Sequence, residues 1–580
     1  MNAPYHPLQT MADVMVMIRQ SELPERRKRD LLSAIRRVSD MTGCAPASLR
    51  VDVPALRKAL DEVRPAAHGM SAATFSNIRS LFGAALKWAG LVESFTRGAA
   101  RRDEQWAPLV AAIAADKRLS AGLASLMNWC AQRSVAPGAV DDEAVQSFLR
   151  WLETRTLKPR VRQRVRETVN IWNEARMRIA FWPAQPLTRL SFRPVSANLT
   201  WEGLTATFRA EAEAYFALRA NPDVFDADPA TPKRKLAPNT IGRQREHLRL
   251  AASVLVREGA LVDATYGLAD LVAMDAFKTV LGRYHKQAGG KPNSFVGVLA
   301  KTLIDVAGFQ VRVPEEHLKE LKRIANMLPS VPFDLTEKNK ALLRQLESED
   351  LRARLFFLPE DLMRWVTLEL QQGRLRAVEA QMAVAVAILL VAPLRPQNLI
   401  ALNSSRHIKE PHGARGKLVI YVSKGETKTK KRDLTFDLPA ELAEPIRWYL
   451  REIRPLLSAD PGGDLFVSKG GKRKSQETLS QQFTEIIAER IGIHMTPHQF
   501  RHFAAFVYLE EHPEDFQSVT DLLGHAWAKT TAIYAGSSGR RASRVYGEHV
   551  IEQRRTLGLR RRRRKGPSGP KTTTGRRKAE

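Results

Sequence analysis

Cysteine is almost missing from this chain, which contains only Cys44 and Cys130 among its 580 residues. Two cysteines are too few for a disulfide framework or for a cysteine-rich zinc site, and they fit a reducing compartment. The amino-terminal segment also lacks the basic start and the apolar run of a signal peptide. The longest apolar stretch, Met382 to Pro393, is shorter than the roughly 18 residues of a membrane span and is typical of a buried helix. We therefore expect a soluble, cytoplasmic protein with no membrane partner.

Acidic residues are scarce relative to basic ones. The chain has 62 Asp and Glu against 91 Lys and Arg, which leaves a formal net charge of +29. A cationic excess of this size favours a polyanionic partner, because binding releases counterions from the polyanion. The alternative is a basic surface that serves only solubility. The charge thus indicates nucleic acid as the partner.

Strand-like alternation is also rare. From Met11 to about Ala180 apolar residues recur at helical spacing, as in SNIRSLFGAALKWAG and EAVQSFLRWLETR. From Leu355 to about Val550 helical segments flank a hairpin, KLVIYV followed by RDLTFDLP, with polar turn residues between the two strands. The predicted fold class is therefore mainly α, with a small β-sheet or hairpin in the C-terminal part.

The composition divides the chain into four regions. We expect an N-terminal helical region over 1–195, formed by one or two modules, and a second helical domain over 196–345. The segment PSVPFDLTEKNK is a connector to a third domain over 350–555. The last region, 556–580, is rich in arginine and lysine and has no apolar face to bury, so it predicts a disordered basic tail.

The residues that can carry chemistry gather in four C-terminal segments. They are APLRPQNL around Arg395, the lysine-rich SKGETKTKKRDLTF, TPHQFRH over 496–502, and LLGHAWAKTTAIY over 522–534. Attack on a DNA phosphodiester needs a nucleophile, neutralisation of the anionic transition state, and a proton for the departing oxygen. Arginine suits the second task, because its planar fork stays charged and grips two phosphate oxygens.

The last two segments have helix-end signals. Thr496 is a predicted N-cap and Pro497 the first helical residue, which would place His498 and Arg501 on one face near a helix N-terminus. Gly524 is a natural C′ residue that ends the helix SVTDLL.

His525 then lies just beyond that helix, and WAKTTAIY predicts a further helix that presents Tyr534. An isolated tyrosine is ordinarily structural. Here the sequence LGH ends at His525, nine residues before Tyr534, and this spacing favours a nucleophilic tyrosine instead.

A zinc site is the competing interpretation, because HQFRH imitates the HExxH metalloprotease pattern. Gln499 stands where the glutamate base is needed, and Arg501 would place a cation next to the metal. We therefore expect no metal and no cofactor. Three other histidines, His494, His502 and His512, are interpreted as ordinary helix or loop residues.

In this order the four segments resemble the tyrosine recombinases, the lambda-type integrase group that shares its catalytic fold with type IB topoisomerases. The similarity covers roughly Leu355 to Tyr546, with three residues from His498 to Arg501, 24 more to His525 and nine more to Tyr534. It implies that Arg395 and Arg501 clamp the phosphate and that the two histidines hydrogen-bond and relay protons. Tyr534 would form a 3′-phosphotyrosyl link, which conserves the energy of the broken bond without ATP or metal.

The resemblance also implies a lysine that protonates the leaving group. Laying SKGETKTKKR on the family's GKGxKxR frame places Lys424 in that role, although Lys428 is the alternative because this turn is longer than usual. Lys424, Lys428, Lys430 and Lys431 could instead all contact the DNA backbone as solvated charges. Gln397 and Asn398 depart from the family's small residue and glutamate beside the first arginine.

The function that follows from this resemblance is site-specific DNA recombination by an integrase or resolvase of a mobile element. The 196–345 domain would be the core-binding (SAM-like) DNA-binding domain, 350–555 the catalytic domain, and 1–195 further DNA-binding modules or a platform for protein contacts. The expected partners are double-stranded recombination sites, other copies of the chain in a tetramer on DNA, and accessory recombinases or DNA-bending proteins, in a bacterial, nucleoid-associated setting. The alternatives are a type IB-like topoisomerase and a DNA-binding protein that has lost catalysis.

Overall fold

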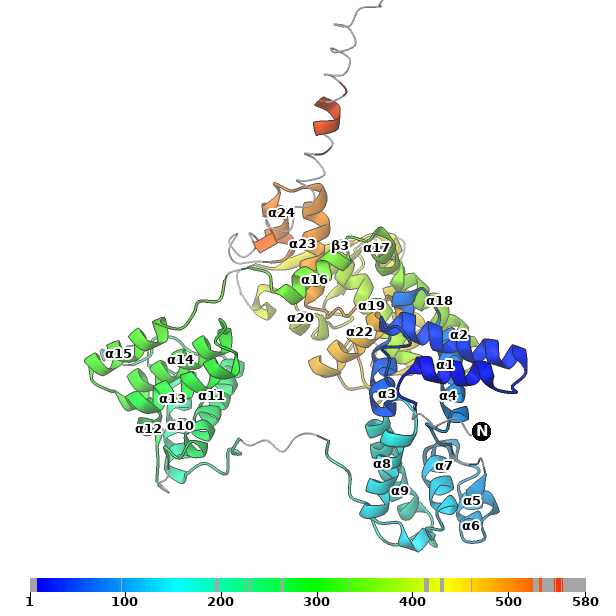
Figure 1. Cartoon of the computed structure of the whole chain (residues 1–580). Coiled ribbons are helices and arrows are strands. Elements are labelled where there is room, and N and C mark those ends of the chain that lie inside the picture. Colours follow the sequence, from blue (N-terminus) through cyan, green and yellow to red (C-terminus); the bar gives the residue numbers. More distant parts are fainter. Residues whose placement is uncertain are drawn as a thin grey trace, which may run out of the picture. The chain divides into compact units, whose positions relative to one another are not determined.

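A computed structural model of the chain shows a mainly helical protein with one small sheet (Figure 1). It describes residues 8–555 except 95, 97, 193–197, 224, 229–230, 262–264, 333, 412–416, 428–431, 461, 525–530, 532, 535–546, 548 and 554. The basic tail expected over 556–580 lies outside the described residues. The chain divides into two compact units, one of Met1–Leu190 with Asp334–Glu580 and one of Ser191–Phe333. The predicted fold class is confirmed.

The N-terminal part of the first unit is built around two hydrophobic cores. The helices of the first core are α1 (Met11–Gln20), α2 (Glu25–Thr42), α3 (Val53–Glu62) and α4 (Ala72–Trp88). Those of the second are α5 (Ala99–Arg102), α6 (Ala107–Ala112), α7 (Lys117–Gln132), α8 (Asp142–Arg155) and α9 (Val161–Arg178). Asp52, Ser71, Asp116 and Asp141 begin four of these helices, and each accepts a hydrogen bond from a first-turn backbone N–H group.

The second unit is an all-helical bundle with its own core (Figure 1). Its helices are α10 (Ala206–Ala220), α11 (Pro238–Arg257), α12 (Leu268–Val272), α13 (Met274–Gln287), α14 (Ser294–Val306) and α15 (Glu315–Asn326). The span Ser294–Val311 is long and apolar enough to cross a membrane by length and composition alone. Val296, Leu299 and Leu303 of this span are buried inside the bundle, which is the setting of a core helix in a globular domain.

The C-terminal part of the first unit surrounds one buried helix, α19 (Ala377–Val391). Its helices are α16 (Glu337–Gln345), α17 (Glu349–Phe356), α18 (Leu358–Gln371), α19, α20 (Pro396–Ile400), α21 (Ala440–Trp448), α22 (Gln476–Arg490), α23 (Gln499–Glu511) and α24 (Phe516–Leu522). Because α19 is apolar all round, other elements cover every side of it, as the run over Met382 to Pro393 predicts.

The expected hairpin is confirmed as β2 (Leu418–Val422) and β3 (Leu434–Leu438), which pair antiparallel with Ile420 opposite Phe436. A third strand, β1 (Ile408–Lys409), pairs antiparallel with β2 at the other edge and was not predicted. Leu418, Ile420 and Val422 are buried, and so are the alternate residues of β3, so one face of the sheet packs on the core.

The N-terminal and C-terminal parts of the first unit are in contact near the C-terminal end of α22. The Arg354 guanidinium donates hydrogen bonds to the carbonyls of Ala66 at 3.3 Å and Arg490 at 2.8 Å. Gly492 has a φ of +94°, and a Cβ there would lie 2.4 Å from the backbone nitrogen of Ala67. Only glycine permits this close approach of the two backbones.

Candidate active site

The first arginine, Arg395, lies at the end of the segment that connects α19 to α20. The chain leaves α19 at Val391, turns through Pro393, and Arg395 takes an extended conformation as the residue before α20. Its side chain is half-buried, and this burial lowers the pKa of the guanidinium because water no longer solvates the charge fully.

The second arginine, Arg501, is buried in α23 with only 4% of its surface exposed. Its Nη1 donates to the carbonyl of Pro393 at 2.6 Å, and its Nη2 donates to the carbonyl of Leu523. One guanidinium thus joins the first arginine segment to the turn that follows α24. Burial first, and then the neighbouring charge of Arg395, lower the pKa of Arg501 to about 10.

Tyr534 lies against Arg501 and is 2% exposed. Its backbone N–H donates to the carbonyl of Thr531 at 3.1 Å, and its Oη lies 2.8 Å from Nδ1 of His502. Burial raises the pKa of Tyr534 to about 12, although the charge of Arg501 opposes that rise. The phenol is therefore protonated and enclosed beside the Arg501 guanidinium in this structure. The helix expected for WAKTTAIY lies largely outside the described residues.

The start of α23 differs from the prediction. The helix begins at Gln499, and His498 rather than Thr496 is its N-cap residue. The Gln499 side chain folds back, and its Oε1 accepts hydrogen bonds from the backbone N–H and the hydroxyl of Thr496. The helix starts two residues later than predicted and has no side-chain N-cap hydrogen bond, so the prediction of Thr496 as N-cap was wrong.

His498 is exposed, whereas Arg501 three residues later is buried. The His498 ring packs edge-on against His502, with ring centroids 5.4 Å apart. His502 was interpreted from the sequence as an ordinary histidine. The structure instead places it between His498 and Tyr534, and its position directly after Arg501 in HQFRH was the available signal.

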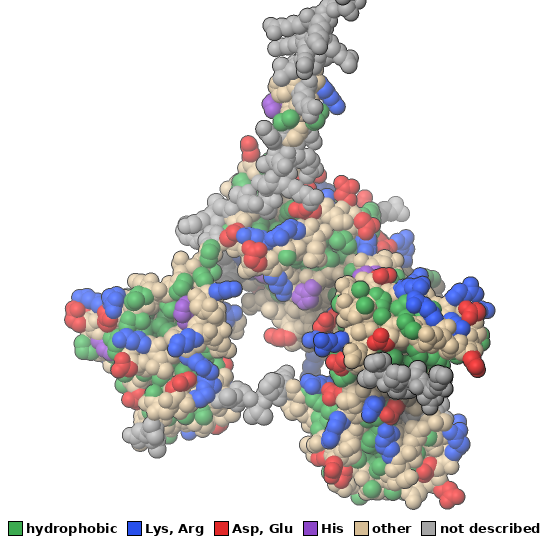
Figure 2. All heavy atoms as spheres, in the orientation of Figure 1, with side chains coloured by type: hydrophobic (Ala, Val, Ile, Leu, Met, Phe, Trp, Pro, Cys, Tyr) green, Lys and Arg blue, Asp and Glu red, His purple; other side chains and the backbone are tan. Residues whose placement is uncertain are grey.

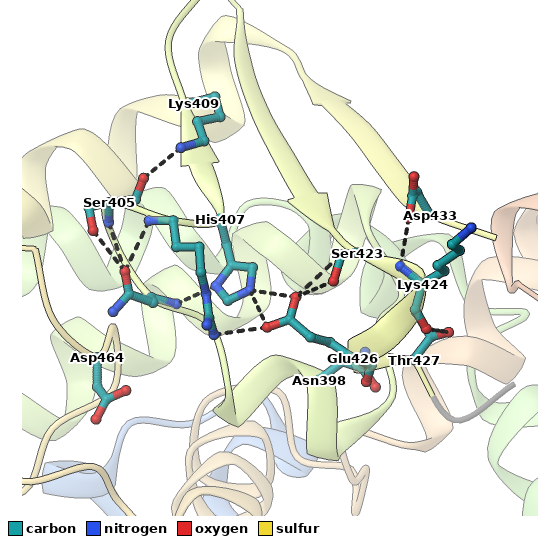
Figure 3. A network of polar contacts seen from close by, with 12 residues as sticks. Asn398, Ser405, His407, Lys409, Ser423, Lys424, Glu426, Thr427, Asp433 and Asp464 are labelled. Carbon is teal, nitrogen blue, oxygen red and sulfur yellow. Dashed lines mark hydrogen bonds and ion pairs between the residues drawn. The ribbon is translucent and has the colours of Figure 1, made fainter. Parts of the chain in front are cut away.

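Lys424 stands in the turn after β2, in the short helical segment Lys424–Glu426 (Figure 3). Its backbone N–H donates to Asp433 at 2.6 Å, while its side chain is exposed. In the part of the chain that the structure describes, no contact joins the Lys424 ammonium group to the arginines or to Tyr534. The alternative lysines, Lys428, Lys430 and Lys431, lie outside the described residues.

A polar network holds this turn (Figure 3). Glu426 accepts from the Ser423 hydroxyl at 2.9 Å and pairs with Arg406 at 2.8 Å. The backbone N–H of Asn403 donates to Nδ1 of buried His407, so the other ring nitrogen donates to Glu426 at 3.2 Å. The S-x-x-E spacing from Ser423 to Glu426 is a capping-box pattern, and it is the sequence signal from which this turn could have been predicted.

Two further contacts connect the hairpin to α20 and to α24. The Asn398 amide, three residues after Arg395, donates to the carbonyl of Glu426 at 3.5 Å. Arg432, which leads into β3, donates to the carbonyl of Thr520 at 2.9 Å and pairs with Asp521 in α24. Asn398, where the family commonly has a glutamate, thus places an amide against the turn that carries Lys424.

Gly524 ends α24 with a φ of +57°, as its predicted C′ role requires. A Cβ on it would lie 3.0 Å from the Leu434 side chain at the start of β3. His525, the next residue, lies outside the described residues. Of the six predicted site residues, the structure brings together Arg395, Arg501 and Tyr534. His498 contacts the His502 ring, and His502 in turn contacts Tyr534.

Among the described residues, no group of three His, Cys, Asp or Glu side chains is arranged to hold a metal ion. The charge at the site comes from arginine. Two neighbouring arginines, one of them beside a buried phenol, within a mainly helical domain that carries a small sheet, are the features expected of enzymes that act on phosphodiesters through tyrosine.

Comparison with known proteins identifies the family. Residues 369–541 match the model of the phage integrase family. Tyrosine recombinase XerC of Alcanivorax borkumensis is 37% identical over 130 residues, which cover 22% of this chain and 41% of that protein. Tyrosine recombinase XerA of Pyrococcus furiosus is 34% identical over 125 residues, 21% of this chain and 38% of that protein. Residues 369–541 of the chain are therefore a phage integrase family domain, similar to tyrosine recombinases, and the resemblance seen in its motifs is confirmed.

Solved structures of two recombinases are also similar. XerH site-specific recombinase bound to palindromic difH substrate, in a post-cleavage complex, matches with a TM-score of 0.35 and 18% identity, covering 58% of this chain and 93% of that one. The Tn1549 transposon integrase in complex with circular intermediate DNA matches with a TM-score of 0.35 and 15% identity, covering 54% and 94%. The curated XerC and XerA matches span only about two fifths of those proteins' length.

Proposed function

We propose that this protein is a site-specific DNA recombinase, an integrase or resolvase of a mobile element, that cuts and rejoins DNA through a 3′-phosphotyrosyl intermediate. The observation that carries the proposal is the pairing of Arg501 with Arg395 beside buried Tyr534. Burial first, and then the like charge of Arg395, lower the pKa of Arg501, and an anion bound by both arginines would offset the repulsion between them. A phosphodiester is such an anion, because a guanidinium group can bind two phosphate oxygens through parallel N–H donors.

In the cleavage step the Oη of Tyr534 attacks phosphorus and the bond from phosphorus to the 5′ oxygen breaks. The phenolic proton passes to a relay histidine, His498 or His525, and Lys424 gives a proton to the 5′ oxygen. Arg395 and Arg501 neutralise the charge that builds on the non-bridging oxygens. The reverse attack by a 5′ hydroxyl rejoins the strand, so the reaction needs no external energy source.

Each region has a proposed part in DNA binding. Residues 196–345 act as the core-binding domain, which with the catalytic domain over 350–555 encloses the duplex, and the 556–580 tail adds phosphate contacts. Lys and Arg side chains lie on the visible surface of both units among acidic ones, as a phosphate-binding protein requires (Figure 2). The partners are double-stranded recombination sites and further copies of the chain in a tetramer. The protein is cytoplasmic and associated with the nucleoid.

The test uses nicked duplexes tiled from the DNA on both sides of the gene, because loss of a short fragment from the nick traps the covalent intermediate. We expect the wild-type protein to form a complex that survives denaturing electrophoresis. Tyr534→Phe should bind the same duplex but leave no covalent product, since only the hydroxyl nucleophile is removed.

A covalent product with Tyr534→Phe would move the nucleophile elsewhere, with Tyr546 the nearest alternative. Relaxation of a supercoiled plasmid without any preferred site would favour the topoisomerase alternative. A wild-type protein that binds one duplex specifically but never reacts would be a DNA-binding protein without catalysis.

A further inference from the structure

His502 contacts the reacting atom of the proposed nucleophile, and the sequence assigned it no role. Its Nδ1 lies 2.8 Å from the Tyr534 Oη, and its Nε2 lies 3.1 Å from the side-chain nitrogen of Asn339. What His502 can do for Tyr534 depends on which ring nitrogen carries the proton, because a neutral imidazole has one donor and one acceptor.

A chain of hydrogen bonds that starts at a backbone group fixes this choice. The Thr496 backbone N–H can only donate, so the Gln499 atom 2.9 Å from it is the amide oxygen. The Gln499 nitrogen therefore faces Asn339 and donates to its oxygen at 3.0 Å. This leaves the Asn339 nitrogen to donate to Nε2 of His502.

The opposite arrangement is excluded by the same chain. If Nε2 of His502 carried the proton, Asn339 and then Gln499 would both have to flip their amides. The Gln499 nitrogen would then face the Thr496 N–H, which places two donors against each other. Nε2 is therefore the acceptor, and the proton of neutral His502 lies on Nδ1, directed at the Tyr534 Oη.

The surroundings of His502 keep the ring neutral. Burial, the His498 ring and the charge of Arg501 together lower the pKa of His502 to about 4. Among the residues that the structure describes, the titratable groups that face the ring are His498 and Arg501 at the start of its own helix and Tyr534 from the following segment. The group from α16 is Asn339, which is neutral.

We propose that His502 is a catalytic residue that donates its Nδ1–H to the Tyr534 oxygen, and that Asn339 is a positioning residue that sets the tautomer. The inference rests on the proposed function, with Tyr534 as nucleophile. As the phenolic proton leaves for a relay histidine, the Nδ1–H bond stabilises the phenolate that attacks phosphorus. It stabilises the same phenolate when the strand is rejoined. His502 is not the base, because its Nδ1 already carries a proton.

The first experiment measures single-turnover cleavage of a nicked duplex by variants of the full chain. His502→Leu removes the donor, and we expect cleavage to fall about 100-fold at unchanged DNA affinity. Asparagine attaches its amide nitrogen to Cγ, as histidine attaches Nδ1, so His502→Asn should stay within about tenfold of the wild type. His512→Leu is the matched control, since His512 packs against Tyr508 at the end of the same helix with ring centroids 4.8 Å apart.

The second experiment tests the tautomer through Asn339→Asp. A carboxylate keeps the contact with Gln499 but can only accept from His502, so neutral His502 must carry its proton on Nε2 and lose the donor toward Tyr534. At low pH the doubly protonated ring still donates from Nδ1. Cleavage by Asn339→Asp should therefore fall about tenfold as pH rises through the histidine pKa, a limb that the wild type lacks.

The outcomes separate this inference from the proposed function. If the wild type forms the covalent complex, Tyr534→Phe does not, and His502→Leu cleaves within threefold of the wild type, the function stands and the role of His502 is wrong. Equal losses in His502→Asn and His502→Leu, with native circular dichroism and DNA binding, would also overturn it. An Asn339→Asp variant that matches or exceeds the wild type at pH 8 would make His502 a base. A covalent product with Tyr534→Phe would defeat the proposed function instead.

Discussion

Arg501 illustrates how a buried cation can keep its charge available for a ligand. Its two hydrogen bonds go to the carbonyls of Pro393 and Leu523, which orient the guanidinium without neutralising it. A guanidinium has five N–H donors, so three remain after these two bonds. A carboxylate in place of the carbonyls would have formed an ion pair and removed the attraction for phosphate.

A prediction at the same scale concerns which lysine, Lys424 or Lys428, protonates the leaving 5′ oxygen. A substrate with a different leaving atom distinguishes the two. A substrate whose 5′ bridging oxygen is replaced by sulfur does not need a proton, because a thiolate leaves readily. Lys424→Ala should cleave ordinary DNA about 100-fold more slowly than the wild type, within the range typical of general acids, and should regain the wild-type rate on the sulfur substrate. Rates of cleavage on both substrates check this.

The matched control is Lys409→Ala, since the Lys409 ammonium donates to the carbonyl of Ser405 at the base of the same sheet. Rescue of Lys428→Ala instead would transfer the role to that residue. If sulfur rescues neither variant, the hairpin lysines only bind the DNA backbone.

At the scale of elements, α24 and the turn after it connect three parts of the site. The Leu523 carbonyl accepts from Arg501, a Cβ on Gly524 would meet the Leu434 side chain of β3, and Arg432 donates to the carbonyl of Thr520 in α24. A shift of this turn would therefore displace the buried arginine and the hairpin together, and it would move His525, which follows directly.

Gly524→Ala tests this connection. Alanine at a φ of +57° is strained by about 1 to 2 kcal/mol, and its Cβ would press on the Leu434 side chain at 3.0 Å. We expect a lower melting temperature together with a cleavage rate reduced at least tenfold, measured by thermal unfolding and single-turnover kinetics.

Gly373→Ala is the control for strain alone. Gly373 also follows a helix at positive φ, +73°, and a Cβ there meets nothing within 4 Å. This variant should lose similar stability and keep its cleavage rate. A Gly373→Ala variant that cleaves as slowly as Gly524→Ala would mean that stability, and not the position of the turn, limits the reaction.

At the scale of the whole molecule, the net charge bears on how the protein would bind DNA in the proposed function. The formal charge of +29 is spread over a chain in which many surface arginines pair with acidic neighbours, such as Arg245 with Glu213. Paired cations contribute less to phosphate binding than unpaired ones. The basic segment over 556–580 carries ten Lys and Arg against one acidic residue, so it concentrates charge that the folded units partly cancel.

Removal of residues 560–580 should weaken binding to all DNA sequences to the same extent and make the dependence on salt shallower, because we expect these basic side chains to contact phosphates and not base edges. Gel-shift titrations at several salt concentrations on cognate and random duplexes measure both quantities. A loss confined to the cognate sequence would show that the tail reads bases.

Cleavage and rejoining should be insensitive to EDTA. In the proposed mechanism the two arginines and a hairpin lysine supply the positive charge that a metal provides in other phosphoryl-transfer enzymes. The covalent-trapping assay with and without chelator checks this. Loss of activity that added zinc or magnesium restores would revive the metalloenzyme interpretation.

The sequence by itself determined the local features of this protein. Apolar runs predicted buried α19, alternation predicted the pair β2 and β3, and the end of α24 at Gly524 followed from the residue alone. The order of the motifs also identified the family, because the spacing from His498 to Tyr534 is written along the chain.

Only the tertiary structure decided which distant groups meet. Arg501 binds a carbonyl 108 residues earlier, and His502 contacts Asn339, 163 residues earlier, and Tyr534, 32 residues later. A helical period shows which residues share a face, but not which face of another helix will cover it. The proton position on His502 depends on this long-range contact, and for that reason a histidine that was ordinary in the sequence became part of the site.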